Sequence, residues 1–237
     1  FIHHGFGGYA SLDANEEHII WVPGFEEIPL IAWQWFERVN RFVRLAQRTE
    51  LSFTDLDCIL RNCCNNTLGH DQLGTIALVR HLHKTYELPI DVVCSLISGS
   101  MNTLGQGNEK EPQDLFNRVY NGRFAAIQKT YFLPEENAYE PDAYKDFLPV
   151  DGTGDLLAPE QKNLRLRLQQ ALQIGKKDLF TIVGAFRERA EAIRRTSILS
   201  GPLNHAALSL LFRVSQLMGA LDISAQDLVD VLGVLSK

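Results

Sequence analysis

The sequence predicts an all-α protein, an irregular array of helical hairpins with a loop-rich insert. The first observation behind this prediction is a unit of two amphipathic helices joined by a tight joint. It occurs four times and reads most clearly as RLAQRTELSFTDLDCIL and RVSQLMGALDISAQDLVDVL. The second observation is that apolar residues on both sides of each joint recur at helical spacing. The third is a long stretch rich in Gly, Pro and acidic residues, which is typical of loops.

The four units share one register, which the joints define. The joints stand at Leu51, Leu88, Ile174 and Ile223. A leucine precedes each joint by six residues, at Leu45, Leu82, Leu168 and Leu217. Five residues after the joints come Leu56, Val93, Leu179 and Leu228, and two further apolar residues follow at offsets of eight and nine. We predict that these positions are buried, and that the structural core includes Leu45, Leu51, Leu56, Leu82, Leu88, Leu168, Ile174, Leu217, Ile223 and Leu228.

The residues directly after the joints indicate where each second helix begins. They are Ser52, Pro89, Gly175 and Ser224. A serine N-cap accepts a backbone N–H from the first turn, and proline is tolerated at the first helical position. The acids that follow both serines by three residues favour the positive end of the helix dipole, although a strict capping box would have Glu or Gln there. Each joint is therefore predicted to be followed at once by a helix.

In chain order, residues 1–28 form an N-terminal segment for which the pattern gives no clear structure. Residues 29–98 form a first helical-hairpin group, residues 99–158 a polar, loop-rich insert with one short helix at 114–120, and residues 159–237 a second group whose first helix begins near Pro159. We expect the two groups to pack as one compact domain. The joints lie 37, 86 and 49 residues apart, which excludes a regular solenoid of fixed period.

Composition narrows the class of protein. The chain has 237 residues, of which 45% are hydrophobic and 22% charged, as expected of a globular protein with a substantial core. Its net charge of −6 disfavours nucleic-acid binding, which needs a basic surface. The sequence shows no run of about 18 apolar residues and no signal peptide. Because the chain begins at Phe1 without an initiator methionine, we expect a fragment or processed product of a longer protein.

One basic cluster could still form a charged surface. It contains Arg187, Arg189, Arg194 and Arg195, and it alternates with glutamates along a predicted helix. We interpret the cluster as a solvated helix face, because oppositely charged side chains at helical spacing support an exposed helix. A surface for nucleic acid or anionic lipid is the alternative.

The candidate residues for chemistry do not form a recognisable catalytic or metal motif. The cysteines are Cys58, Cys63, Cys64 and Cys94; they contain no C-x-x-C pair. We predict buried structural thiols, and any disulfide pairing and the redox state are left open. His81 and His83 diverge by roughly 200° on a helix, which is wrong for two ligands of one metal. A metal-dependent hydrolase using His70, these two histidines and acids of the insert is a third hypothesis.

A family resemblance rests on nine residues around the first joint. They are Arg41, Phe42, Arg44, Leu45, Leu51, Ser52, Asp55, Leu56 and Asp57. This pattern resembles the recurrent helical motif in A subunits of bacterial Tc insecticidal toxin complexes, which is related to the Salmonella plasmid virulence protein type. Residues 73–97 and 208–235 are similar to other copies of that motif. The resemblance covers residues 29–98 and 160–237.

The resemblance implies a place for the chain in a very large toxin, secreted or held at the bacterial cell surface. Such A components form a pentameric, bell-shaped pore, in which a helical shell surrounds the channel that delivers a toxic enzyme. The chain would be a noncatalytic scaffold fragment of this shell, without cofactor or metal. Its partners would be neighbouring A protomers, other toxin-complex subunits and a host-cell receptor. The alternative function is a helical protein- or peptide-binding adaptor, which needs an exposed apolar groove.

Overall fold

The computed structural model describes residues 8–12, 19–23, 29–103, 114–121, 159–192 and 204–235. These residues hold nine helices and two short strands, so the all-α prediction is confirmed apart from one β-hairpin. The chain divides into two compact units, Phe1–Asp57 (unit 1) and Cys58–Lys237 (unit 2). The division falls inside residues 29–98, which the sequence pattern predicts to be one helical-hairpin group.

Unit 1 contains the β-hairpin and the first joint. Strands β1 (Gly8–Leu12) and β2 (Ile19–Pro23) pair antiparallel, with Ala10 opposite Trp21. Helix α1 (Pro29–Thr49) follows, and α2 (Phe53–Cys63) begins in this unit. Strands β1 and β2 could not be predicted from the sequence, because a strand of five residues has too few alternating positions for a clear period of two.

Unit 2 contains the remaining helices. They are α3 (His70–Tyr86), α4 (Ile90–Ser98), α5 (Leu115–Tyr120), α7 (Pro159–Leu172), α8 (Lys176–Ala192), α9 (His205–Leu221) and α10 (Ala225–Leu235). The short helix predicted at 114–120 is confirmed as α5. It begins after Asp114, whose carboxylate caps the helix by accepting the backbone N–H of Asn117 at 2.9 Å. The helix predicted to begin near Pro159 is α7. The rest of the insert lies outside the described residues.

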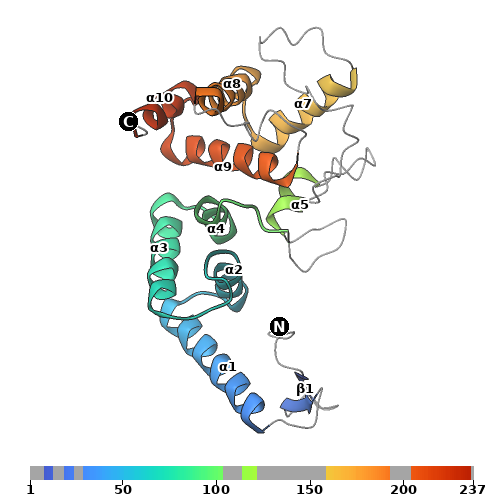
Figure 1. The fold of residues 1–237 in the computed structure, drawn as a ribbon, viewed down its shortest axis with the longest axis vertical. Helices are drawn as coiled ribbons and strands as arrows, with labels where there is room; N and C mark the ends of the chain where they lie inside the picture. The colour runs from blue at the N-terminus through green and yellow to red at the C-terminus, as the bar shows by residue number, and fades with distance from the viewer. Residues whose placement is uncertain are drawn as a thin grey trace. The chain divides into compact units, whose positions relative to one another are not determined.

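Helix α9 is the centre of unit 2. It packs against α4 on one side and α7 on the other, while α8 packs against α10 and α3 against α4 (Figure 1). Eight of its residues are buried, and the six apolar ones belong to a core shared with α5, α7, α8 and α10. The contact between α4 and α9 places parts of both predicted hairpin groups in one compact unit. The buried residues of α9 are Ala207, Leu208, Ser209, Leu211, Phe212, Val214, Ser215 and Met218.

Helices α9 and α10 are closer to perpendicular than to antiparallel. The two helices are bent by 99° at their joint. Helix α10 packs on α8, the second helix of the preceding pair, and α9 packs on α7, the first helix of that pair. Among the described helices, none alone has the length and apolarity of a membrane span; α9 and α10 meet that criterion only when taken together as a bent pair.

Candidate functional site

The four joints share the same helix boundaries and the left-handed conformation of one residue. In every unit the first helix ends two residues before the joint, and the second begins two residues after it. The residue immediately before each joint has a left-handed conformation, with φ between 51° and 58°. These residues are Glu50, Glu87, Gln173 and Asp222. Different residues (Glu, Glu, Gln and Asp) thus adopt the same conformation at the same position, so the sequence repeat is also a structural repeat.

Hydrogen bonds at the third and fourth joints explain why an apolar residue is needed there. The Ile174 N–H donates to the Gln169 carbonyl at 3.2 Å, and the Ile223 N–H to the Met218 carbonyl at 3.1 Å. Such a bond, closing a helix through a left-handed residue, defines the Schellman motif. The residue after the left-handed one usually packs on an apolar side chain in the last turn. The leucine six residues before the joint occupies that position.

Two of the joints are closed by a serine–aspartate cap. At the fourth joint the Asp227 N–H donates to Ser224 Oγ at 3.2 Å, and the Ser224 N–H donates to Asp227 Oδ2 at 3.2 Å. At the first joint the Asp55 N–H donates to Ser52 Oγ at 3.0 Å. Asp227 therefore fills the role that Glu or Gln has in the usual capping box. The hydrogen bonds from Ser224 lower the pKa of Asp227.

The second joint differs from its expected geometry by one residue. Pro89 is the N-cap of α4 rather than its first helical residue, and Ile90 begins the helix. The Pro89 carbonyl accepts the Val93 N–H at 3.0 Å, so the proline still contributes to the first turn. Its missing N–H costs nothing because the N-cap lies outside the helical hydrogen-bond ladder.

Burial of the predicted core residues is graded. Leu56, Leu168 and Leu228 are buried. The other predicted core residues are half-buried, and in unit 2 four of them pack against the main core: Leu88, Ile174, Leu217 and Ile223. The expectation that all four leucines six residues before the joints are fully buried is therefore too strong for Leu45, Leu82 and Leu217.

The position five residues after the joint is buried in every unit. Its occupants are Leu56, Val93, Leu179 and Leu228. The position eight residues after the joint is less regular: Ile59 and Ile182 are buried, but Val231 is 48% exposed. The expectation of burial at every position of the apolar stripe is therefore wrong for α10. The neighbour of α10 with the most extensive contact is α8.

A short segment after α4 is tied to α9 by hydrogen bonds that join residues distant in sequence. The Met101 N–H donates to Ser209 Oγ at 3.1 Å, and Nε2 of His205 bonds the Met101 carbonyl at 3.1 Å. The Tyr120 hydroxyl donates to the Leu208 carbonyl at 2.8 Å. Burial lowers the pKa of His205, and the hydrogen bond to Met101 raises it less; burial also raises the pKa of Tyr120. These groups are structural ties between α5, α9 and the chain around Met101.

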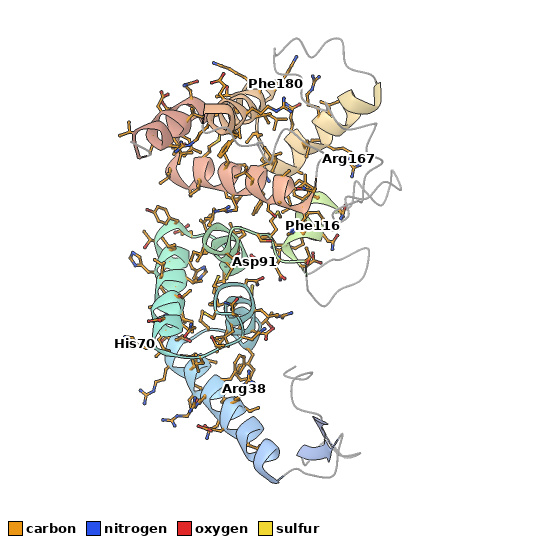
Figure 2. All side chains as sticks on the ribbon, in the orientation of Figure 1. Arg38, His70, Asp91, Phe116, Arg167 and Phe180 are labelled. Atoms are coloured by element: carbon orange, nitrogen blue, oxygen red, sulfur yellow. The ribbon has the colours of Figure 1, made fainter. Side chains whose placement is uncertain are left out.

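Charged side chains are used mainly to close helix ends in unit 2. Arg213 on α9 donates from Nη2 to the Leu96 carbonyl at 3.1 Å, in the last turn of α4. Asp91, labelled on α4 in Figure 2, pairs with Arg118 of α5 at 2.6 Å. Arg189 donates to the Leu232 carbonyl at 3.1 Å, near the end of α10.

The basic helix face predicted in α8 is only partly solvated. Arg187 is buried, which contradicts the interpretation of this cluster as wholly exposed. Arg189 is exposed but bonded to α10, as described above. Arg194 and Arg195 lie outside the described residues. Helix α8, which carries Arg187 and Arg189, packs against α10.

Three of the four cysteines meet where α2 faces α4. The Cys63 thiol donates to the Cys94 carbonyl oxygen at 3.7 Å. Interaction with the Cys94 side chain lowers the pKa of Cys58 and of Cys63. Cys64 and Cys94 are buried, whereas Cys58 and Cys63 are half-buried; all four are free thiols. Burial raises the pKa of Cys64. Sequence spacing could not reveal this cluster, because Cys94 reaches it from another helix.

The predicted histidine candidates do not converge. His70, at the start of α3 (Figure 2), and His81 are exposed, whereas His83 Nδ1 bonds the Leu88 carbonyl at 2.6 Å across the second joint. Within the described residues, no group of three or more His, Cys, Asp or Glu side chains has the arrangement of a metal site. The acids of the insert, which the hydrolase hypothesis needs, lie largely outside the described residues.

Comparison with known proteins adds no family assignment. No protein-family model matches this sequence, and no curated protein matches it either. The described site is thus defined by the four joints, the ties around α9 and the cysteine cluster, and the function has to be inferred from them.

Proposed function

We propose that the chain is a noncatalytic scaffold segment of the helical shell of an insecticidal toxin A component. The observation that carries the proposal is the joint geometry, in which four helix pairs are connected through the same left-handed residue and the same apolar joint position. The residues behind the family resemblance include Leu51, Ser52 and Asp55 of the first joint. In the structure these residues form the connection and its N-cap. The resemblance therefore rests on residues with a structural role.

The polar interactions of unit 2 also support a scaffold. Among the described residues other than cysteines, the groups with shifted pKa values are Tyr120, His205, Arg213 and Asp227, and each shift is explained by burial or by a cap. Perturbed groups at catalytic sites usually combine burial with a specific charge partner in a cleft. Tyr120 and His205 instead bond backbone carbonyls of neighbouring segments. Their described interactions hold elements together.

Exposed apolar side chains on α10 suit a segment that continues into a larger assembly. Val231 and Val234 are 48% and 71% exposed, and their separation of three residues places them on the same helix face. Helix α10 has two acidic residues and no basic residue. Although a bend near 100° also occurs in DNA-binding helix-turn-helix motifs, this second helix lacks the positive charge that phosphate contact requires.

The proposal is tested with the full-length polypeptide that carries this chain. Negative-stain electron microscopy and mass photometry should show bell-shaped particles of five copies. A short epitope is inserted between Asn65 and Asn66, which are exposed in the loop before α3, and a Fab against it should decorate the outer wall of the particle. The untagged protein is the control for nonspecific Fab binding.

Two results would overturn this assignment. A full-length protein that stays monomeric under conditions where the partner subunits are present would remove the toxin proposal. Fab density inside the channel or on the bound enzyme subunits would refute a place in the shell. Specific capture of a short peptide by the isolated chain, together with a monomeric parent protein, would favour the adaptor alternative.

A further inference from the structure

Helix α1 carries an exposed row of arginines. The helix contains four arginines and one acid, Glu37, so its side chains have a net charge of +3 in a chain whose net charge is −6. The first of these arginines, Arg38, is labelled on α1 in Figure 2. Successive arginines are separated by three or four residues, and all of them are exposed: Arg38, Arg41, Arg44 and Arg48.

Three of these residues share one face of the helix and form the arginine stripe, which consists of Arg41, Arg44 and Arg48. Because successive helical residues are rotated by about 100°, the three side chains fall within about 60° of one another, and Arg38 lies at the edge of the stripe. From Arg41 to Arg48 the helix rises by about 10 Å, which is close to one Debye length at physiological salt. The three charges therefore act together on an anionic surface that approaches this face.

The arginine stripe has few interactions within the chain. Arg41 pairs with the Glu37 carboxylate at 2.6 Å, and the two side chains are 58% and 49% exposed. Within the part of the chain that the structure describes, Arg44 and Arg48 form no hydrogen bond and no ion pair. Their charges remain available to a partner.

The opposite face of α1 packs on the protein. Ala46 is buried, and the ring of Phe42 lies with its centroid 5.7 Å from that of Phe53, in the first turn of α2. These apolar positions lie roughly 100–200° around the helix from the stripe. The arginines are thus held outward by the packing of the other side, and the stripe is a fixed feature of the surface.

The composition of the exposed face indicates the kind of partner. Beside the arginines stand Asn40 and Gln47, and Phe36, which is 43% exposed, is the large apolar side chain at the edge. A protein interface needs apolar or aromatic anchors at its centre, which a row of arginine and amide side chains does not supply. Anionic headgroups need only positive charge close to the membrane surface, and an aromatic ring beside that charge suits the headgroup boundary.

We propose that the arginine stripe of α1 binds the surface of a membrane that contains anionic phospholipid. The inference goes beyond the scaffold function and does not depend on it. The acidic character of the whole chain does not oppose it strongly, because exposed charges farther away than a Debye length are largely screened. A nucleic-acid site commonly makes about six to ten phosphate contacts, which is more than this row supplies.

Vesicle flotation of the folded chain tests the proposal. The chain is mixed with vesicles of phosphatidylcholine that contain about one third phosphatidylserine, and separately with vesicles of phosphatidylcholine alone. It should float with the anionic vesicles only, and about 0.5 M NaCl should release it, since the Debye length then falls to roughly 4 Å. Flotation with both kinds of vesicle, or with neither, would overturn the proposal. Tighter binding of duplex DNA at equal phosphate concentration would also overturn it.

Charge variants assign the binding to the stripe. Arg44→Gln and Arg48→Gln should each weaken binding to the anionic vesicles about fivefold, which is the usual contribution of one basic side chain near such a surface. Glu37→Gln should strengthen binding by a similar factor, because it removes the acid that pairs with Arg41. Variants of opposite sign on one helix separate an effect of charge from a loss of structure.

A matched control removes a positive charge outside α1. Lys177→Gln, at an exposed position of α8, should leave vesicle binding unchanged. Circular dichroism checks that every variant is folded, and the salt and lipid dependence of the unsubstituted chain decides the question if one is not. Equal losses in the Lys177 and Arg44 variants would show that the total charge governs binding and would remove the stripe as the site.

Discussion

Single residues decide how the helices of this protein are joined. At each joint a residue other than glycine adopts the left-handed conformation, which costs roughly 1–2 kcal/mol for an L-amino acid. In a Schellman motif, apolar packing between the residue after the left-handed one and the last turn of the helix accompanies this conformation. A residue other than glycine has this conformation in all four units: Glu50, Glu87, Gln173 and Asp222. Glycine would suit the same conformation without this strain.

We expect Gln173→Gly to stabilise the protein. Gln173 is exposed and has a φ of 56°, so its replacement removes strain and no described contact. The free energy of unfolding should rise by about 0.5–1 kcal/mol, measured by urea denaturation. The matched control is Gln170→Gly, three residues earlier in α7, which should instead lower stability by about 1 kcal/mol because it places glycine inside a helix. A loss of stability in both variants would contradict the role assigned to Gln173.

His205 should make stability depend on pH. Its pKa is lowered in the folded state from an ordinary value of 6.5 because burial disfavours the imidazolium form. The folded protein therefore holds this proton less tightly than the unfolded chain. Stability is complete above about pH 6.5 and falls as the pH decreases from there toward the folded pKa.

The measurement is the melting temperature between about pH 7.5 and 5.5. His205→Gln should reduce the fall in melting temperature over this range, since Gln retains a donor for the Met101 carbonyl without titrating. His81→Gln, at an exposed position of α3, serves as the control and should leave the fall unchanged. An unchanged slope in the His205 variant would remove the proposed contribution.

At the scale of elements, the contribution of a helical side chain to stability depends on whether its face of the helix packs against the core. Leu168 of α7 is fully buried, whereas Leu166 on the same helix is 52% exposed. Two leucines separated by two residues diverge by roughly 200° around a helix, so one contacts the core and the other faces outward. The difference in burial between Leu168 and Leu166 predicts different losses of stability when each is replaced by alanine.

Leu168→Ala should lower the free energy of unfolding by about 2–5 kcal/mol, through lost burial and the cavity that remains. Leu166→Ala is the matched control and should change it by less than about 0.5 kcal/mol, since exposed substitutions are usually small in effect. Urea denaturation at constant pH measures both. Similar losses in the two variants would show that α7 is not oriented as described.

At the scale of the whole chain, stability is expected to be divided between two units. All three tryptophans, Trp21, Trp33 and Trp35, belong to unit 1, while most helices belong to unit 2. Tryptophan fluorescence therefore reports on unit 1, and far-ultraviolet circular dichroism reports mainly on unit 2. Two units that unfold independently do not satisfy a single two-state transition.

The unfolding curves from the two probes should consequently not coincide in urea. Phe180→Trp in α8 adds a fluorescent reporter to unit 2, and the additional signal should follow the circular dichroism curve. If fluorescence of the original chain, fluorescence of the variant and circular dichroism give one common midpoint, the chain unfolds as a single cooperative body and the prediction is wrong.

The sequence by itself determined the helical fold class, the four joints and the helix that begins at residue 159, because apolar periodicity and capping residues act over a few turns. It also predicted the short helix at 114–120, which Asp114 caps. Only the tertiary structure decided which apolar positions are fully buried, as the contrast between Leu168 and Val231 shows.

The structure alone also revealed the contacts between residues distant in sequence. The buried Arg187, the hydrogen bond from Met101 to Ser209 and the approach of Cys63 to Cys94 depend on helices that meet through packing. A local sequence pattern does not predict these contacts, because the two residues in each contact are far apart in the chain. Local free energies therefore set the elements and their joints, and packing set the candidate sites.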